Sequence, residues 1–201
     1  MEHYFTENPD VISKKREISY NFNNINFKFI TDNGVFSKAH VDTGTEILIK
    51  SFLKYNDLDK FSFLDFGCAY GAVGIIVAKF YENSKITFLD INNRALDLAA
   101  ENIKLNKIKN KVNLVQSDIL SNADDTFDVI LLNPPIRAGK ETIFEMYKKS
   151  YEHLNKNSYL YVVIMTKHGA KSTEKELLNI FDEVVCINKD KGYRVYKAKK
   201  L

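Results

Sequence analysis

FSFLDFGCAYGAVGIIVAKFY, residues 61–81, is the stretch of sequence that decides the fold. Its first part, residues 61–67, is a short apolar run that ends in an acidic residue and a glycine, which is typical of a strand buried on both faces. Its second part, residues 71–81, has the length and apolar content of a helix. A buried strand that passes through a glycine-containing turn into a helix predicts one unit of a parallel sheet covered by helices.

The same alternation continues downstream. Further strands are expected at 85–90, 111–118, 127–135 and 159–165, and further helices at 94–106, 140–154 and 173–181. The last two strands, 183–188 and 193–199, are separated only by Lys189–Gly192, which is too short for a parallel crossover. They must therefore form an antiparallel hairpin at the edge of the sheet.

Upstream of residue 61 the pattern differs. Residues 18–31 alternate apolar and polar side chains around Asn23-Asn24, which predicts a β-hairpin, and a helix is expected near 43–54. The expected fold class is α/β: a doubly wound, mostly parallel sheet with an antiparallel last strand, plus an N-terminal hairpin and helix. We expect a single domain over 1–201, with 1–60 as an N-terminal extension and 61–201 as the core.

The composition is that of an ordinary globular protein, with 45% hydrophobic and 27% charged residues in a chain of 201, which excludes collagen-like and disordered chains. The two cysteines, Cys68 and Cys186, form no CxxC or Cys/His cluster, so neither a disulfide scaffold nor a metal site is expected. No apolar run has the length of a membrane helix, and the polar, acidic start does not resemble a signal peptide. We expect a cytoplasmic protein, a monomer rather than an obligate oligomer. The net charge of +3 is too small to establish a nucleic-acid partner.

Three carboxylates, Asp65, Asp90 and Asp118, follow the ends of three consecutive expected strands. Ligands of open parallel sheets bind at that edge. Asp65 suits a cationic ligand such as a sulfonium with an ammonium group, Asp90 can accept both hydroxyls of a ribose, and Asp118 can accept an adenine amino group. Each also has a structural interpretation: a tight turn without ligand, an acid at a helix N-terminus, and a cap of a short turn. A dinucleotide site is disfavoured, because that frame would place Ala69 and Ala72 at its second and third glycines.

Asn133-Pro134-Pro135-Ile136 follows the fourth expected strand, at the same edge. The segment fits methylation of a planar amino nitrogen, whose delocalised lone pair makes it a poor nucleophile. The Asn133 side-chain oxygen and the Pro134 carbonyl can each accept one N–H and so turn the nitrogen toward an incoming methyl group. The rigid φ of proline fixes this backbone, and proline adds no competing N–H. A strand terminator with an Asx turn is the structural alternative.

With these motifs in order, the chain resembles class I S-adenosylmethionine-dependent methyltransferases, and within them the bacterial 16S ribosomal RNA guanine-N2 methyltransferase family, small methyltransferase domain. The resemblance covers almost the whole chain and implies a Rossmann-like sheet. The family loop D-x-G-x-G-x-G is matched from Asp65 to Gly71, and segments 34–37 and 42–45 resemble the part that closes over the methionine end of the cofactor. The cofactor-binding residues it implies are Phe36, Ser37, Gly44, Thr45, Asp65, Gly67, Cys68, Ala69, Gly71, Asp90, Ile91, Asp118, Ile119 and Asn133.

Two positions depart from the family pattern. Ala69 replaces the middle glycine of the loop, where its methyl group is either tolerated or crowds the cofactor. Ile136 stands where related amino methyltransferases have an aromatic residue that stacks on the flipped base, and we expect it, with Phe36, to hold the ring instead. Longer relatives also carry a second, degenerate methyltransferase-like domain, for which this chain has no room.

The resemblance implies methyl transfer from S-adenosylmethionine to the exocyclic N2 of a guanine in small-subunit ribosomal RNA, with Asn133, Pro134, Pro135 and Ile136 at the catalytic centre. The implied partner is ribosomal RNA or the small subunit. Arg137 and Lys140, and the basic tail 189–200, are candidate phosphate contacts or simply solvated charges. Adenine N6 or a protein glutamine amide are alternative substrates, because both nitrogens are planar. A non-catalytic RNA-binding assembly factor is a further alternative.

Overall fold

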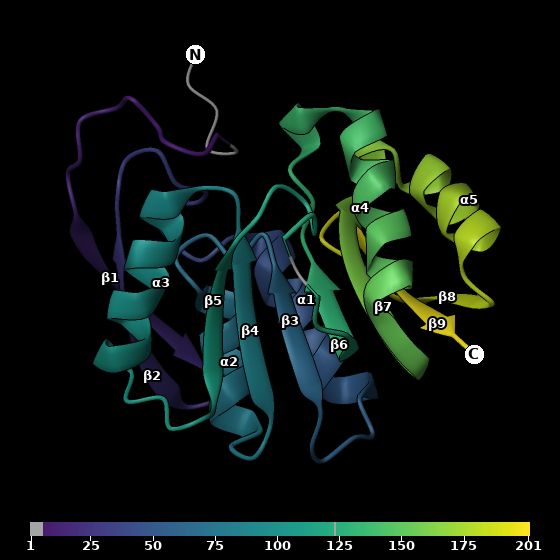
Figure 1. The fold of residues 1–201 in the computed structure, drawn as a ribbon, viewed down its shortest axis with the longest axis horizontal. Coiled ribbons are helices and arrows are strands. Elements are labelled where there is room, and N and C mark those ends of the chain that lie inside the picture. Colours follow the sequence, from purple (N-terminus) through teal and green to yellow (C-terminus); the bar gives the residue numbers. More distant parts are fainter. Residues whose placement is uncertain (1–5, 123) are drawn as a thin grey trace.

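A computed structural model describes residues 6–122 and 124–201 and confirms the expected fold. The main sheet has seven strands in the order β5-β4-β3-β6-β7-β9-β8 (Figure 1). Its strands are β3 (Ser62–Phe66), β4 (Lys85–Asp90), β5 (Val112–Gln116), β6 (Phe127–Leu132), β7 (Leu154–Met165), β8 (Glu183–Asp190) and β9 (Tyr193–Lys200). Strands β3 to β7 are parallel to one another, whereas β9 runs antiparallel to both neighbours, as the hairpin argument predicts.

Helices cover both faces of this sheet, which is why its central strands are apolar throughout. One hydrophobic core lies beneath α1 (Thr43–Tyr55), α2 (Ala72–Phe80) and α3 (Asn93–Leu105). A second core lies beneath α4 (Lys140–His153) and α5 (Ala170–Ile180), which stand in front of β7 and β9 in Figure 1. Short 3-10 turns, η1 (Ile136–Ala138) and η2 (Thr166–His168), follow β6 and β7.

The N-terminal hairpin is formed by β1 (Arg16–Phe22) and β2 (Ile25–Thr31). Asn23 and Asn24 connect them with φ of 47° and 63°, and asparagine tolerates this left-handed region better than most residues. The hairpin packs on α3, where the Asn102 side chain accepts from Ile30 N (2.6 Å) and donates to Ile30 O (2.9 Å). This contact fixes the start of the loop that follows β2.

Several element boundaries differ from the sequence prediction: β6 ends at Leu132 rather than at 135, and α5 begins at Ala170 rather than at 173. Strand β7 begins at Leu154, directly after α4, because Leu154 is buried and pairs with Phe127 before the register shifts at a bulge. Strand β5 ends at Gln116, so Asp118 lies in the following turn rather than at the end of the strand. Within the described residues, no helix has the length and apolarity needed to cross a membrane.

Candidate functional site

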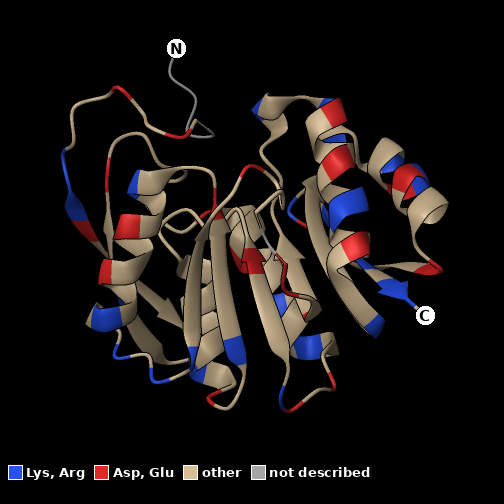
Figure 2. Ribbon diagram, viewed as in Figure 1, with Lys and Arg blue, Asp and Glu red and all other residues tan. Residues whose placement is uncertain are grey.

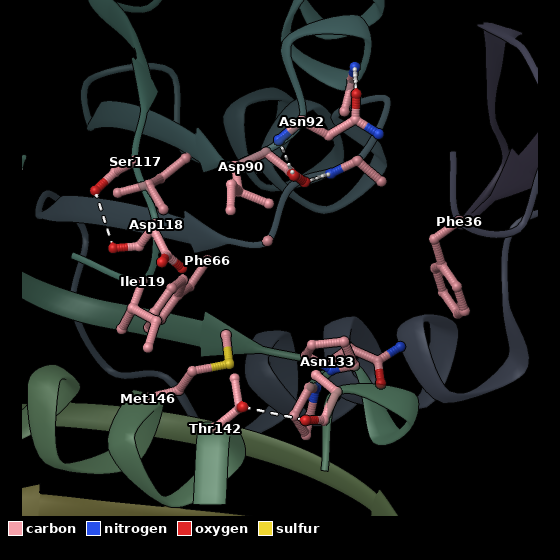
Figure 3. Close-up of a pocket in the computed structure, with 18 of the residues that line it drawn as sticks. Phe36, Phe66, Asp90, Asn92, Ser117, Asp118, Ile119, Asn133, Thr142 and Met146 are labelled. Atoms are coloured by element: carbon pink, nitrogen blue, oxygen red, sulfur yellow. Dashed lines mark hydrogen bonds between the residues drawn. The ribbon is translucent and has the colours of Figure 1, made fainter. Parts of the chain in front are cut away.

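A cavity of about 310 Å³ opens at the carboxyl edge of the sheet, within the size range of small-molecule sites (Figure 3). Residues after β3, β4, β5 and β6 line it, together with the loop before α1 and one face of α4. A smaller cavity of about 40 Å³ adjoins it and shares Phe36, Gly67 and Asn133. The edge that the strand order predicts to bind a ligand is therefore hollow.

The turn after β3 brings backbone close to the cavity. Gly67 has a φ of 75°, and a Cβ placed there would meet no atom within 4 Å, so the space beside it is open to a ligand. Ala69 also has a left-handed φ, 48°, and lines both cavities. The methyl group at the expected middle glycine is thus accommodated in a conformation that costs an L-residue about 1 kcal/mol.

Asp90 explains why Ala69 adopts this conformation. Its carboxylate accepts from Ala69 N at 2.8 Å and from Asn92 N at 2.9 Å, and it lines the cavity (Figure 3). The Ile91 backbone is a third donor to this carboxylate, which has about four lone-pair sites, so one is left for a ribose hydroxyl. Burial raises the pKa of Asp90 to about 6, although the backbone donors act in the opposite direction.

Asp65 lies deeper. It lines the smaller cavity and accepts from Gly74 N at 2.9 Å, which ties β3 to α2. Burial raises the pKa of Asp65 to about 7, and the neighbouring Asp90 acts in the same direction. A Cβ on Gly74 would lie 2.3 Å from the ring of Phe88, so this glycine serves packing of α2 on β4.

Ser117, Asp118 and Ile119 line the opposite end of the cavity. The turn at 118–121 is held by the main-chain carbonyl of Asp118, which accepts from both the amide and the hydroxyl of Ser121. In the described part of the chain, these hydrogen bonds do not use the Asp118 carboxylate, which is exposed. The Asp118 side chain is therefore not the cap of this turn, and its contact with a ligand stays a prediction.

Asn133 has its amide orientation fixed by two acceptors. Its Nδ2 donates to Asp42 Oδ2 at 3.1 Å and to Thr45 Oγ1 at 3.0 Å. Asp42 is the N-cap of α1, and the same oxygen accepts from Thr45 N at 3.0 Å. A carboxylate only accepts hydrogen bonds, whereas a hydroxyl can also donate, so Asp42 is the partner that sets the orientation. Among the described residues the Asn133 carbonyl oxygen has no donor, and Asn133 lines both cavities, so this oxygen is available as an acceptor where they meet.

All charged side chains that line the two cavities are carboxylates, as far as the described residues show: Asp90 and Asp118 in the larger, and Asp42 and Asp65 in the smaller. Such a lining attracts a cation and repels phosphate groups. This lining disfavours the pyrophosphate of a dinucleotide and suits a ligand with a sulfonium and an ammonium group. No group of three or more His, Cys, Asp or Glu side chains suited to a metal occurs in the described residues.

The structure places several predicted site residues beside the cavities and others away from them. Ile91, Pro134 and Pro135 line the larger cavity, and Ser37 and Cys68 the smaller. The predicted residues that line neither cavity are Gly44, Gly71, Ile136, Arg137 and Lys140.

Packing and exposure explain these positions. A Cβ on Gly44 would lie 2.8 Å from the Tyr193 ring, so that glycine allows the last hairpin to approach α1. Gly71 is the N-cap of α2 with a φ of 87°, and it faces Ala99. Ile136 is 37% exposed in η1, and Pro135 and Ala138 line the cavity on either side of it.

Several lining residues were not among those predicted from the sequence. Val35 comes from the loop before α1, Asn92 from the N-cap of α3, and Thr142 and Met146 from α4 (Figure 3). The α4 residues carry no local signal, because only the packing of that helix brings them to the edge. Asp42 did carry a signal, since aspartate three residues before a threonine is a common helix cap.

Comparison with known proteins places this chain among methyltransferases. The sequence profile of the methyltransferase small domain matches residues 26–197. The chain belongs to this family. It is 44% identical to the uncharacterized protein YbxB of Bacillus subtilis, over all of this chain and 99% of that one.

More distant relatives are longer. The ribosomal RNA small subunit methyltransferase C of Actinobacillus pleuropneumoniae is 31% identical over 95% of this chain, which spans only 57% of that protein. A T. thermophilus 16S rRNA N2 methyltransferase, solved with AdoMet and guanosine, shares the fold with a TM-score of 0.81 at 19% identity, over 96% of this chain and 52% of that one. The chain thus spans about half the length of the relatives named as RNA methyltransferases.

Proposed function

We propose that this protein transfers a methyl group from S-adenosylmethionine to the exocyclic N2 of a guanine in small-subunit ribosomal RNA. The orientation of Asn133 carries the proposal, because both amide hydrogens are engaged by Asp42 and Thr45 and the carbonyl oxygen is free to accept from an amino group. The Pro134 carbonyl, in the same cavity wall, is the second acceptor. Two acceptors suit a nitrogen that presents two N–H groups.

The cavities fit the cofactor from end to end. Asp118 and Ile119 would face the adenine of the cofactor, and Asp90 would face its ribose. The turn at Gly67 would pass close to the middle of the cofactor. Asp65 and Asp42 would lie toward its charged methionine end in the smaller cavity. When bound there, the cofactor supplies an electrophilic methyl on a sulfonium that leaves as a neutral thioether.

The protein's contribution to the step is alignment. Asn133 and Pro134 hold the amino group in line with the methyl, and this positioning replaces a bimolecular encounter by a local one. The nitrogen forms the new bond to the methyl carbon while the carbon–sulfur bond breaks, and the N–H proton then passes to water. No strong base is needed, because the methylated nitrogen is acidic. The base must leave its stack to reach Asn133.

The guanine assignment rests on the names of relatives and on the Asn133 segment. Methyltransferase C relatives are named for small-subunit RNA, and the structural neighbour was solved with guanosine. We extend the proposal to a cytoplasmic protein that acts on ribosomal RNA or on the small subunit, as a monomer.

The decisive experiment measures tritiated methyl incorporation into RNA, DNA and protein fractions, followed by mass-spectrometric mapping of the modified nucleotide. The wild-type protein should label RNA at a guanine, and Asn133→Ala should abolish labelling while calorimetry shows cofactor binding retained. Labelling of DNA or protein would instead identify adenine N6 or a glutamine amide as the acceptor. Undetectable cofactor binding at millimolar concentration would favour a non-catalytic assembly factor.

A further inference from the structure

The carboxyl edge of the sheet is divided by charge. On the side of β4 and β5, the residues at the cavity are Asp90 and Asp118. On the side of β6, β7 and β9, the connecting segments carry exposed basic side chains (Figure 2). We define the basic rim as Lys38, Arg137, Lys140, Lys167, Lys189 and Lys191, all of which are exposed.

Backbone contacts bring these segments together. Tyr193 pairs with Met165 at the end of β7, and Thr166 N donates to Gly192 O at 2.8 Å, so the β8–β9 turn lies beside η2. The Tyr193 ring also packs on Gly44, one residue from the start of α1. Lys167, Lys189 and Lys191 therefore border the same edge as Asn133.

Arg137 and Lys140 extend this border on the other side of Asn133. Arg137 lies in η1, between the cavity-lining residues Pro135 and Ala138, and Lys140 begins α4. Lys38 belongs to the loop that also contributes Phe36 to the cavity. The rim thus follows the cavity mouth on the side where the target base must enter.

Internal contacts leave the rim charges available. Across residues 6–122 and 124–201, the ion pairs involve none of the six rim residues. Lys38 donates to the neutral Asn33 Oδ1, and Lys140 lies 5.0 Å over the Phe144 ring. Two exposed acids, Glu141 and Asp190, lie among them, and Lys191 is one of the cations that lower the pKa of Glu46 on α1. Six basic residues against these three acids leave the rim with an excess of positive charge.

The remaining basic residues of the tail are used by the fold. Lys200 donates to the carbonyls of Tyr151 and Leu154, and Lys197 donates to Tyr55 O and lies 4.0 Å over the Tyr159 ring. Arg194 and Lys199 approach carboxylates on α5 and β8 and are half-buried. The tail 189–200 is therefore not one phosphate-binding face. The lysines of the β8–β9 turn are available to bind phosphate, whereas the basic residues of β9 are engaged within the protein.

We propose that the RNA backbone docks along the basic rim, an inference that rests on the proposed function. The target base then enters beside Asn133, and the phosphates of the RNA stay on the β6–β7–β9 side. The carboxylates of the cavity repel phosphate, so only the uncharged base can enter. The division of charge also keeps the RNA away from the β4–β5 side, where the cofactor's adenosine would lie. One edge of the sheet thus orients two substrates.

The test compares two variants that each remove three exposed lysines. The rim variant is Lys167→Gln/Lys189→Gln/Lys191→Gln, and the control is Lys104→Gln/Lys109→Gln/Lys111→Gln, at the opposite edge of the sheet. The probe is a full-length small-subunit ribosomal RNA transcript, and binding is measured by filter retention between 50 and 200 mM salt. Each lost phosphate contact makes the negative slope of log K against log salt shallower by about 0.7–0.9. The rim variant, which removes three lysines, should therefore have a slope about two units shallower than that of wild type and bind the transcript at least tenfold more weakly.

The control variant should bind within threefold of wild type, and both variants should bind S-adenosylmethionine as wild type does. The rim variant should also raise the KM for RNA while kcat at saturation is unchanged. Equal weakening by the two triple variants would overturn the rim as a docking surface and leave only general charge attraction. If the wild-type protein itself neither binds nor methylates the transcript, the proposed function fails, whereas wild-type methylation with an unaffected rim variant refutes this inference alone.

Discussion

Replacing Asp42 by serine should release Asn133 without unfolding α1. Serine is as good an N-cap as aspartate, so its hydroxyl can still accept from Thr45 N. It is too short to reach Asn133 Nδ2, which lies 3.1 Å from the aspartate oxygen. The remaining partner of the amide, the Thr45 hydroxyl, can donate as well as accept and so does not dictate which way the amide turns.

The size of the effect follows from the bond that is lost. A hydrogen bond to a charged group contributes about 1.5–3 kcal/mol, and tenfold in rate corresponds to about 1.4 kcal/mol. Asp42→Ser should therefore lower kcat about 10–100-fold. Thr45→Val removes only the neutral bond at 3.0 Å, worth about 0.5–1.5 kcal/mol, and should lower kcat about 2–10-fold.

The assay is methyl transfer to RNA at saturating cofactor, with thermal unfolding measured in parallel. Asp42→Ser should melt within about 2 °C of wild type, whereas Asp42→Ala, which also loses the cap, should melt about 2–4 °C lower. An Asp42→Ser protein that retains wild-type kcat, or loses less than Thr45→Val, would show that the carboxylate does not position Asn133.

Three further predictions concern the cofactor side. Burial raises the pKa of Asp90 to about 6, so the folded protein holds this proton more tightly than the unfolded chain, and the resulting stabilisation is present below about pH 4 and lost as the pH rises through 6. Cofactor affinity, which needs the ionised carboxylate as ribose acceptor, should rise over the same interval in calorimetry, and Asp90→Asn should remove that rise. Gly67→Ala should weaken cofactor binding with only a small change in melting temperature. Gly74→Ala, which places a Cβ 2.3 Å from Phe88, should lower the melting temperature by several degrees and leave cofactor affinity unchanged. The reverse pattern would contradict the packing described. Ala69→Gly removes the strain of a left-handed alanine at φ 48° from the folded state but raises the conformational entropy of the unfolded chain. The melting temperature should therefore rise by only about 1–2 °C, and a fall would mean that the alanine is unstrained.

The fold was predictable because its signals are local. Short apolar runs mark the parallel strands, and two of these strands, β3 and β4, carry an aspartate at or near their carboxyl ends. The four residues Lys189–Gly192 allow no crossover, so the antiparallel β9 follows from chain length alone. The start of β7 was not predictable, because 154–158 is mostly polar and is drawn into the sheet by the buried Leu154. Pairing with β6 there outweighs the local pattern.

The site was predictable where it depends on strand ends and not where it depends on packing. Asp90 and Asn133 lie at the cavity because parallel strands end at one edge. Gly44 matches the family pattern in sequence and Ile136 stands in place of its aromatic residue, yet the first faces Tyr193 and the second lies outside the cavity lining. Met146 reaches the cavity only through the placement of α4.

The acidic lining also bears on turnover under the proposed function. Asp42 and Asp65 border the smaller cavity, where the cofactor's charged end would lie. Methyl transfer converts the sulfonium into a neutral thioether, so the product loses one of the charges that these carboxylates attract. The same side chains therefore favour the cofactor over its product, and this difference helps the spent cofactor leave.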